Sequence, residues 1–401
     1  MKIRSITVFV DIRPDLDAGL LARCGAFARQ AQQTFRSAGL AVQTTRLTMD
    51  IFPALEASEW ADRPAEFAAR LEKTCQAQGF EYVATGPATQ SMLPRVAEML
   101  RATGSVFITA QIVDPATGAI DGEMIRQSAR VIGAAMHIEA GFGNLRFAAL
   151  ANVPAGTPFF PAAYHGDGPP SFALALESAD LAVQACTGAS DAENARQRLI
   201  AALETEAGRL VPVAEQLARE HGFTFGGLDF SLAPFPTLEI SIGAALEALT
   251  GQPLGSAGTL AAAATLTDAI DQARFPHAGF CGLMLPVLED LVLAQRAAQG
   301  RLNVGELLQW SAVCGTGLDT VPLPGDVSED ALVGLLFDVA ALSVRLHKPL
   351  TARLMPLPGK RSGDAVHFDF AYFADGGVLP LEGGAGRLSN TGSLMLHPRP
   401  R

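Results

Sequence analysis

The sequence predicts an α/β fold in which parallel strands alternate with crossover helices. Strand-like and helix-like patterns follow one another strictly from residue 1 to about residue 125. Continuous apolar runs such as VFITA fit strands that are covered on both faces. The chain has 401 residues, 49% of them hydrophobic and 18% charged, and no repeat or long polar linker divides it. We therefore expect one large α/β domain over residues 1–401, with an alternating half at 1–178 and a helix-rich half at 179–401.

The first elements follow from local periodicity. The apolar run ITVFVDI at residues 6–12 predicts a buried strand, and residues 15–37 carry the Leu, Ala and Phe stripe of a helix. Residues 41–49 alternate apolar and polar side chains, which is typical of a strand. The elements expected next are a helix over 63–75, a strand over 82–87, a helix over 93–101 and a strand over 106–112.

The middle of the chain, from residue 122 to about residue 177, has a different pattern. A helix ending near His137 leads into the strand-like run GFGNLRFAALANV, and a second strand-like run, SFALALES, follows later. The loop between these runs is rich in Pro, Gly and aromatic residues and contains Tyr164, His165 and Asp167. Polar groups on a loop between buried strands are a common way to build a site.

The second half is predicted to be mostly helical. Residues 179–220 form one long Ala- and Glu-rich helical pattern, which the Gly- and Pro-containing run GGLDFSLAPFP interrupts. The elements expected after it are several short helices over 240–312, a helix over 329–346, strands over 351–358 and 366–373, and a loosely structured tail over 383–401.

Composition limits the possible partners and compartments. The net charge of −11, with no Lys/Arg cluster longer than a pair, argues against nucleic acid as a partner. The five cysteines are widely spaced without a CxxC pair, which supports neither a zinc ribbon nor a disulfide framework. No signal peptide or membrane-length apolar run is evident, so we expect a cytoplasmic protein without a membrane partner. Ala-rich helices and acidic charge also allow a homodimer.

The stretch SAVCGTGLDTVPLPGD presents the first candidate site. Gly315 and Gly317 lie one and three residues after Cys314, and their conformational freedom would let backbone N–H groups surround a thiolate or a bound anion. Asp319 lies nearby, although a carboxylate beside a thiolate raises the pKa of the thiol. The alternative is that Cys314 is a small buried residue at the end of a strand or helix, as most free cysteines are.

Two further segments carry candidate polar groups. His165 is a candidate general base and Tyr164 a hydrogen-bond donor, while the alternative is a turn in which both cap backbone groups. After the GFG turn, Asn144 and Arg146 are placed to reach a pocket, where an arginine would hold a carboxylate as a fork. An ordinary surface arginine is the alternative. Arg353 belongs to the best local group of cations in the sequence.

Candidate metal ligands are scattered along the chain. His137 and Glu139 are two residues apart, so on a helix they would face different directions. Asp229 lies with Ser231 in LDFSLAP, where a turn or cap is the alternative to chemistry, and no GxSxG motif accompanies it. Glu289 precedes another carboxylate in GLMLPVLED, a pair that suits a divalent cation or a solvent-facing helix end.

Several runs resemble uncharacterised protein family 0210, also called domain of unknown function 711. The matching runs, in order along the chain, are RFAALANV, PFFPAAYH, LDFSLAP, GLMLPVLED, SAVCGTGLDTVPLPGD and RLHKPLTARLMPLPGK. The resemblance implies a pyruvate formate-lyase-like α/β barrel of about ten strands, surrounded by helices and enclosing a loop that can carry a cysteine. Cys314 is the candidate for that position. The tail lacks the Arg-Val-x-Gly-Tyr-like run of glycyl radical enzymes, so no glycyl radical is expected.

The leading hypothesis from the sequence is a non-radical enzyme that acts on a small carboxylate-bearing metabolite inside the barrel. Cys314 would act as nucleophile or acid/base in lyase or acyl-transfer chemistry, with His165 handling protons and Asp319 as a further catalytic candidate. The residues expected to bind the substrate are Tyr164, Asn144, Arg146, Arg353, Gly315 and Gly317. One alternative is metal-dependent hydrolysis or lyase chemistry through His137, Glu139, Asp229 and Glu289. The other is a metabolite-binding sensor without catalysis. The cofactor is left open, with a divalent metal as one option.

Overall fold

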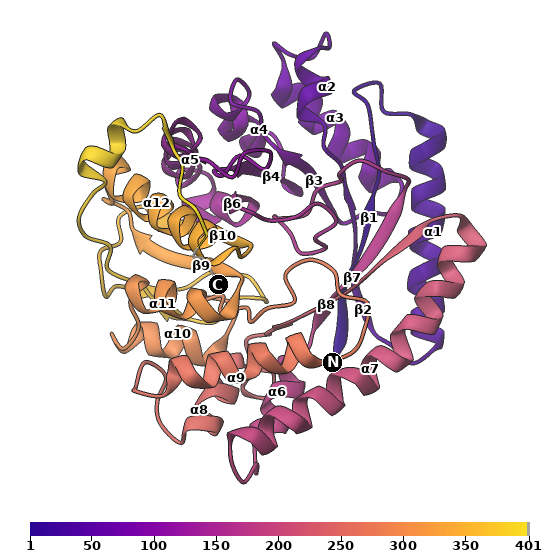
Figure 1. The fold of residues 1–401 in the computed structure, drawn as a ribbon. Helices are drawn as coiled ribbons and strands as arrows, with labels where there is room; N and C mark the ends of the chain where they lie inside the picture. The colour runs from indigo at the N-terminus through magenta and orange to yellow at the C-terminus, as the bar shows by residue number, and fades with distance from the viewer. Residues whose placement is uncertain (399–401) are drawn as a thin grey trace.

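The computed structural model describes residues 1–398 and is built around a nine-stranded, mostly parallel sheet (Figure 1). The strand order is β8-β7-β1-β2-β3-β4-β6-β10-β9. These strands are β1 (Lys2–Phe9), β2 (Val42–Thr48), β3 (Tyr82–Pro87), β4 (Val106–Gln111), β6 (Phe147–Ala151), β7 (Ser171–Glu177), β8 (Thr224–Ala233), β9 (Gly317–Pro324) and β10 (Leu350–Leu357). Two small pairs complete the strands: β11 (Ala365–Val366) with β12 (Gly376–Gly377), and β13 (Ser393–Leu394) with β5 (Ile120–Asp121).

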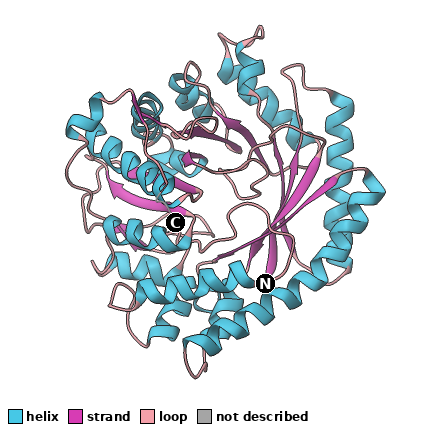
Figure 2. Ribbon diagram, in the orientation of Figure 1, coloured by secondary structure: helices cyan, strands magenta, loops and turns pink. Residues whose placement is uncertain are grey.

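Helices surround this sheet on its outer side, and the strands and several long loops lie inside them (Figure 2). The α-helices are α1 (Ala18–Ser37), α2 (Phe52–Glu56), α3 (Pro64–Ala77), α4 (Val96–Arg101), α5 (Gly122–Ala135), α6 (Ala179–Cys186), α7 (Ala192–His221), α8 (Ile242–Thr250), α9 (Thr259–Gln272), α10 (Leu291–Ala298), α11 (Val304–Cys314) and α12 (Glu329–Leu346). The short 3-10 helices are η1 (Leu93–Arg95), η2 (Glu139–Arg146), η3 (Leu238–Ile240) and η4 (Gly386–Asn390).

The predicted α/β class is confirmed, but the strands are not all parallel. β1, β2, β3, β4 and β6 form one parallel run. β7 is antiparallel to β1, and β10 is antiparallel to β6. β8 is parallel to β7, and β9 is parallel to β10, so a two-strand unit of opposite direction flanks each side of the central run.

The strand order explains why one face of the sheet is free of helices. From β1 to β4 each strand lies beside the one before it, and right-handed crossovers then place the connecting helices on the same face. Loops cover the other, inner face. Thr7 Oγ1 donates to the carbonyl of Pro158 at 2.8 Å and Thr48 Oγ1 to that of Ala163 at 2.9 Å, which attaches the loop between β6 and β7 to the sheet.

A second inner segment, residues 276–290, bonds to both edge strands of the sheet. Met284 N donates to the carbonyl of Ser231 in β8 at 2.9 Å. Val287 N donates to the carbonyl of Asp319 in β9 at 3.0 Å. Backbone groups at both edges therefore have partners within the chain, which satisfies groups that an open edge would leave exposed.

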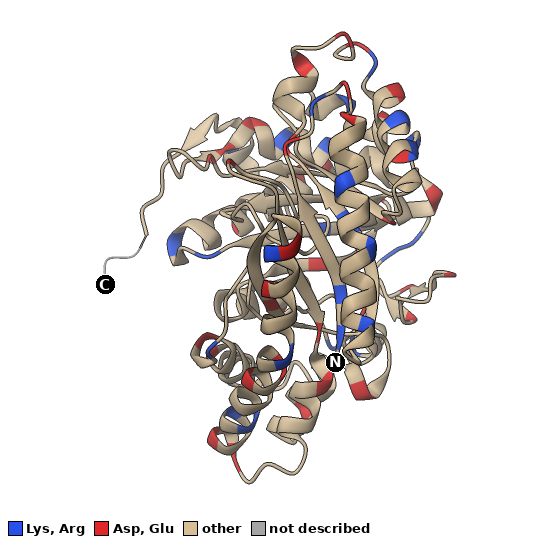
Figure 3. Cartoon of the chain, turned by 90° about the vertical axis from the view of Figure 1, so that its right-hand side faces the viewer, with Lys and Arg blue, Asp and Glu red and all other residues tan. Residues whose placement is uncertain are grey.

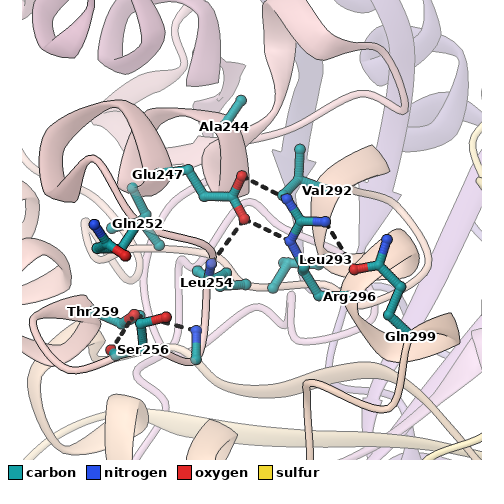
Figure 4. A network of polar contacts seen from close by, with 12 residues as sticks. Ala244, Glu247, Gln252, Leu254, Ser256, Thr259, Val292, Leu293, Arg296 and Gln299 are labelled. Atoms are coloured by element: carbon teal, nitrogen blue, oxygen red, sulfur yellow. Dashed lines mark hydrogen bonds and ion pairs between the residues drawn. The ribbon is translucent and has the colours of Figure 1, made fainter.

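The outer helices are held to one another by polar contacts as well as by packing. Figure 4 shows the carboxylate of Glu247 in α8 accepting from both Nε and Nη2 of Arg296 in α10, at 2.6 and 2.8 Å. The same carboxylate accepts from Leu254 N at 2.8 Å, which fixes the turn after α8. On the side drawn in Figure 3, acidic and basic residues are interspersed over the outer helices. No helix within residues 1–398 has the length and apolar character needed to cross a membrane.

Three element predictions are wrong in detail. The expected helix over 179–220 is two helices, because α6 ends at Cys186 and Asp191 caps the start of α7. The expected strand over 366–373 is confined to β11, and its aromatic side chains pack against Phe142 instead of entering the sheet. Part of the tail is ordered by pairing, since β13 bonds to β5.

Candidate functional site

A pocket that contains five charged side chains lies on the inner face, near the amino ends of β1, β3 and β4. Its polar and charged lining residues are Arg4, Gln43, Thr44, Arg46, Tyr82, Glu289, Asp319, Arg353 and Tyr372. Its apolar lining residues are Phe107, Leu145, Phe159, Phe160, Ala233, Pro234, Met284, Pro286 and Phe370. The cavity measures about 80 Å³. It is bounded by the sheet, by both inner segments and by the aromatic segment after β11.

One side of this pocket is a network of paired charges. Arg353 donates from Nε to Asp319 Oδ1 at 2.5 Å and from Nη2 to Glu289 Oε1 at 2.7 Å. Arg4 pairs with the other oxygen of Glu289. Arg353 and Glu289 are 6% and 5% exposed, so the network lies almost entirely out of water. Pairing is what makes such burial of charge tolerable.

Irregular strand pairing places these charges on the inner face. Arg4 is the extra residue where the pairing of β1 with β7 shifts register. Arg353 lies where the pairing of β10 with β9 shifts, opposite Asp319 and Thr320. Thr320 has a φ of 42°, a left-handed value that is unusual for a residue other than glycine. Bulges of this kind redirect side chains and are common beside active sites.

Arg46 is the exception among the three arginines, because it has no acidic partner. Within residues 1–398 the only hydrogen bond of its side chain runs from Nε to Thr44 Oγ1 at 3.0 Å, and the guanidinium forms no ion pair. Its guanidinium carbon lies 5.4 Å from the ring centre of Tyr82 and 5.1 Å from that of Phe160. Only 8% of Arg46 is exposed. Burial, with a smaller contribution from Arg4, lowers the pKa of Arg46 to about 10, so the side chain is still charged at neutral pH.

Two other pocket groups are available to a ligand. The amide oxygen of Gln43 is buried and accepts no hydrogen bond from the described part of the chain. Burial raises the pKa of Tyr82, although Arg46 opposes the shift, so the phenol stays protonated at neutral pH and can donate.

The two carboxylates of the network have opposite pKa shifts. Burial raises the pKa of Asp319, only partly opposed by Arg353. Burial also acts to raise the pKa of Glu289, but Arg4 and Arg353 outweigh it and hold that pKa below its usual range. Glu289 therefore serves as a fixed negative charge. Asp319 is the carboxylate of the pair better suited to exchanging a proton.

Comparison with known proteins identifies the family. A family model described as Uncharacterised ACR (DUF711) matches residues 1–371. The chain belongs to the DUF711 family. A UPF0210 protein of Pyrobaculum arsenaticum is 32% identical over 393 residues, covering 91% of this chain and 87% of the relative. A UPF0210 protein of Acetivibrio thermocellus is 30% identical over 353 residues, covering 82% of this chain and 77% of the relative. The family expected from the sequence motifs is confirmed.

Of the site residues expected from the sequence of this DUF711 member, three meet in the pocket. Asp319, Arg353 and Glu289 come from segments that are far apart in the chain, and they form the paired network. Glu289 was expected as a metal ligand, but in the structure it accepts hydrogen bonds from two arginines. Lysine and arginine side chains carry donors only, so these contacts use the lone pairs that a cation would need.

The other expected substrate-binding side chains make structural contacts away from this pocket. Arg146 donates to the carbonyl of Leu100 at 2.8 Å and to Thr103 Oγ1 at 3.2 Å. Its guanidinium is therefore buried and bonded within the protein, and it is not free to hold a carboxylate. Asn144 donates to the carbonyl of Ile132 at 3.1 Å. The expectation that Asn144 and Arg146 reach the mouth of the pocket is wrong, because burial in η2 turns both toward backbone carbonyls.

Tyr164 and His165 are on the inner loop, as expected, but they do not line the pocket. Tyr164 donates to the carbonyl of Val153 at 2.8 Å, and burial raises the pKa of its phenol to about 12. His165 is 6% exposed, and burial lowers the pKa of its imidazole, opposed by the nearby Asp11. The alternative interpretation was a turn in which both side chains bond to backbone groups, and the contact of Tyr164 agrees with it. Chemistry at His165 stays a prediction.

Cys314 is the last residue of α11 and not part of an exposed loop. It is fully buried within the main hydrophobic cluster, and its nearest polar side-chain partner is Thr316 Oγ1 at 3.9 Å. The end of a helix presents carbonyl groups, whereas the expected anion cradle required N–H groups. Cys314 does not line the charged pocket, and its catalytic role stays a prediction.

The two glycines after Cys314 have backbone roles. Gly315 ends α11 in a left-handed conformation with a φ of 78°. A Cβ at Gly317 would lie 2.2 Å from the carbonyl oxygen of Thr351, so the close pairing of β9 with β10 requires a glycine there. Both glycines were expected to bind the substrate, but neither lines the charged pocket.

The candidate metal ligands do not come together. Among residues 1–398 there is no group of three or more His, Cys, Asp or Glu side chains placed to hold a metal ion. Asp229 is fully buried and accepts from the backbone N–H groups of Ser231, Phe280 and Cys281, at 3.1, 2.8 and 3.0 Å. Its carboxylate thus attaches the inner segment to β8. His137 and Glu139 lie in and after the turn that follows α5.

Arg4, Arg46 and Tyr82 were not predicted from the sequence as site residues. Arg46 sits in the alternating run AVQTTRLTM, in which polar residues would ordinarily face solvent. Arg46 could have been found by noting that β2 belongs to a predicted parallel run, because strands in such a run are covered on both faces. A polar side chain there must face an interior site or a buried partner.

Proposed function

We propose that this protein binds a small carboxylate-bearing metabolite in the inner pocket and acts on it as an acid–base enzyme. The single observation that carries the proposal is the unpaired Arg46. Arg46 is only 8% exposed, and its side chain has neither a carboxylate partner nor a second hydrogen-bond acceptor within residues 1–398. An uncompensated buried charge is strongly unfavourable, so a site that keeps one is adapted to receive an anion.

The chemistry of Arg46 favours a carboxylate as that anion. A guanidinium offers parallel N–H donors that match the two oxygens of a carboxylate. Because Nε is already bonded to Thr44, the two terminal amino groups are the donors left for a ligand. The rings of Tyr82 and Phe160 hold the guanidinium plane in place, which reduces the ordering required when a ligand binds.

Asp319 is the proposed acid–base group. It lines the same pocket, its Oδ1 is oriented by Arg353, and its raised pKa brings proton exchange closer to neutral pH. A ligand whose carboxylate is held by Arg46 would share this small cavity with Asp319. Tyr82 is placed to donate a hydrogen bond to the same ligand.

We also infer that the sheet and the inner segment 276–290 together make a closed barrel of the pyruvate formate-lyase-like type. The support is the bonding of this segment to both edge strands, β8 and β9. Enclosure matters for the function, because a pocket shielded from water strengthens each electrostatic contact to a ligand.

Binding is tested with sodium butanoate as the probe, by isothermal titration calorimetry. We expect the wild-type protein to bind butanoate and Arg46→Met not to bind it. Arg46→Lys should bind it more weakly than wild type, because lysine keeps the positive charge but lacks the two parallel N–H donors of a guanidinium. Lys348→Met is the matched control, since Lys348 is a half-buried cation that does not line the pocket. Equal butanoate affinity in wild type and Arg46→Met would refute the proposal.

Catalysis is tested with the molecule that the protein itself retains. Small molecules released from purified, heat-denatured protein are identified by mass spectrometry, and the carboxylate found is then incubated with native protein. We expect wild type to convert it and Asp319→Asn to bind it without conversion. Binding with no conversion by wild type would leave a metabolite-binding sensor as the function.

A further inference from the structure

We propose that the pocket selects monoanions, and specifically short monocarboxylates with an uncharged, mainly apolar body, over dicarboxylates and phosphates. The inference rests on the proposed function, because it takes Arg46 as the group that holds the carboxylate. It further specifies the net charge, the size and the polarity of the metabolite.

The charge preference follows from the balance of ionic groups around the pocket. Three guanidinium groups, of Arg4, Arg46 and Arg353, face two carboxylates, of Glu289 and Asp319, which leaves one positive charge. Behind the pocket lining, buried Glu177 lies 3.3 Å from Lys2 and 4.0 Å from Arg4, and the charge of Lys2 balances that of Glu177. One negative charge on a ligand therefore neutralises the site.

A second negative charge would have no partner. Arg353 already bonds both carboxylates of the network, and Arg4 is engaged by Glu289. A second carboxylate on the ligand would meet Glu289 and Asp319 as like charges in a poorly hydrated space, where repulsion is weakly screened. Phosphate, which carries more than one charge at neutral pH, meets the same difficulty.

The cavity volume limits the size of the metabolite. The cavity measures about 80 Å³. One water needs roughly 10–15 Å³ by this measure, so the cavity holds about five to eight atoms of water-like size. This range corresponds to a short-chain acid, whereas a fatty acid of medium length would extend beyond the cavity.

The apolar walls determine the character of the ligand beyond its carboxylate. Six aromatic side chains line the pocket: Tyr82, Phe107, Phe159, Phe160, Phe370 and Tyr372. Tyr82 and Phe160 lie against the guanidinium of Arg46. Phe107 contacts both of these rings edge-on, with ring centres 5.3 Å apart in each pair. Burying an uncharged hydrocarbon body against such rings is favourable, whereas burying a further polar group without a partner is not.

The test is a panel of four probes measured by isothermal titration calorimetry against wild-type protein: sodium butanoate, sodium butanedioate, inorganic phosphate and sodium decanoate. We expect butanoate to bind at least roughly tenfold more tightly than each of the others. Glu289→Gln removes one negative charge from the network and should narrow the gap between butanoate and butanedioate. Glu329→Gln, at an exposed pair on the outer surface, is the matched control and should leave the gap unchanged.

The outcomes separate this inference from the proposed function. If butanoate binds through Arg46 but butanedioate or phosphate binds as tightly, the charge selection is refuted and the proposed function stands. Equal binding of decanoate refutes the size limit alone. If butanoate binds with the same affinity to wild type and Arg46→Met, or not at all, the proposed function fails and this inference fails with it. The wild-type panel is decisive even if Glu289→Gln does not fold.

Discussion

Replacing Arg353 by Met should destabilise the protein strongly and in a pH-dependent way. Arg353 is 6% exposed and is the shared donor to Asp319 at 2.5 Å and to Glu289 at 2.7 Å. Its loss leaves the buried carboxylate of Glu289 and the partly buried carboxylate of Asp319 with only Arg4 to compensate them. Breaking a buried pair by removing one partner typically costs about 3–5 kcal/mol. An exposed pair such as that of Arg130 costs at most about 1 kcal/mol, which makes Arg130→Met the matched control.

The pH dependence of this effect has a definite sign. In wild type the pKa of Glu289 is held low, so its contribution to stability is present above the pKa of the unfolded chain and is lost as the pH falls. In Arg353→Met, burial raises the pKa of both Glu289 and Asp319 with less opposition, so stability is lost as the pH rises. The difference between wild type and variant should therefore shrink between about pH 8 and about pH 5.

The assay is equilibrium unfolding in urea at both pH values, followed by circular dichroism, for wild type, Arg353→Met, Arg353→Lys and Arg130→Met. Arg353→Lys keeps the charge but loses the second donor direction, so we expect a smaller loss that changes little with pH. A loss in Arg353→Met that equals the loss in Arg130→Met, or that grows toward acidic pH, would refute the reasoning about the ion network.

Three further outcomes are expected. Gly39→Ala should lower the free energy of unfolding by about 1 kcal/mol, because Gly39 has a positive φ but open space around it. Gly317→Ala should lower it well beyond this, because Gly317 also has a positive φ and its new Cβ would lie 2.2 Å from a carbonyl oxygen. Asp229→Ala should lower the free energy of unfolding by about 3 kcal/mol or more, since buried N–H groups lose their acceptor. Asp191→Ala, which removes an exposed cap of α7, should cost only about 1 kcal/mol. Ellman's reagent should titrate no cysteine of the native protein and all five, Cys314 included, after denaturation.

Each of these expectations would be contradicted by a specific result. Equal denaturation midpoints for Gly317→Ala and Gly39→Ala would show that β9 and β10 are less closely paired than described. Asp229→Ala as mild as Asp191→Ala would mean that the inner segment is not held by that carboxylate. Rapid reaction of a native thiol at Cys314 would contradict its burial in the hydrophobic cluster and would support the predicted catalytic role.

Much of the fold was predictable because local periodicity is a short-range property. The strands over 82–87 and 106–112 and the helix over 329–346 agree with β3, β4 and α12 to within a residue or two. The segment over 366–373 failed for a physical reason. Its aromatic residues suit a strand, but they gain more by packing on Phe142 than by pairing, and no sequence pattern shows that neighbour in advance.

The candidate site was predictable in part. Asp319, Arg353 and Glu289 stood in conspicuous motifs, and the structure joins them. The alternation within β2 alone did not identify Arg46, because the same alternation of polar and apolar residues describes a solvent-facing strand; the place of β2 within a parallel run was the signal that separates the two. The bulges that turn Arg4 and Asp319 inward depend on the partner strand and not on local composition.

The sequence by itself determined the α/β class, the family, the acidic surface charge and the identity of most helices and strands, since these depend on neighbours within a few residues or on motifs in the chain. Only the tertiary structure decided the order and direction of the strands, which face is free of helices, and which arginine lacks a partner. These properties depend on contacts between residues that are tens to hundreds of positions apart. Burial and pairing, which give a charged side chain its chemistry, exist only once those contacts have formed.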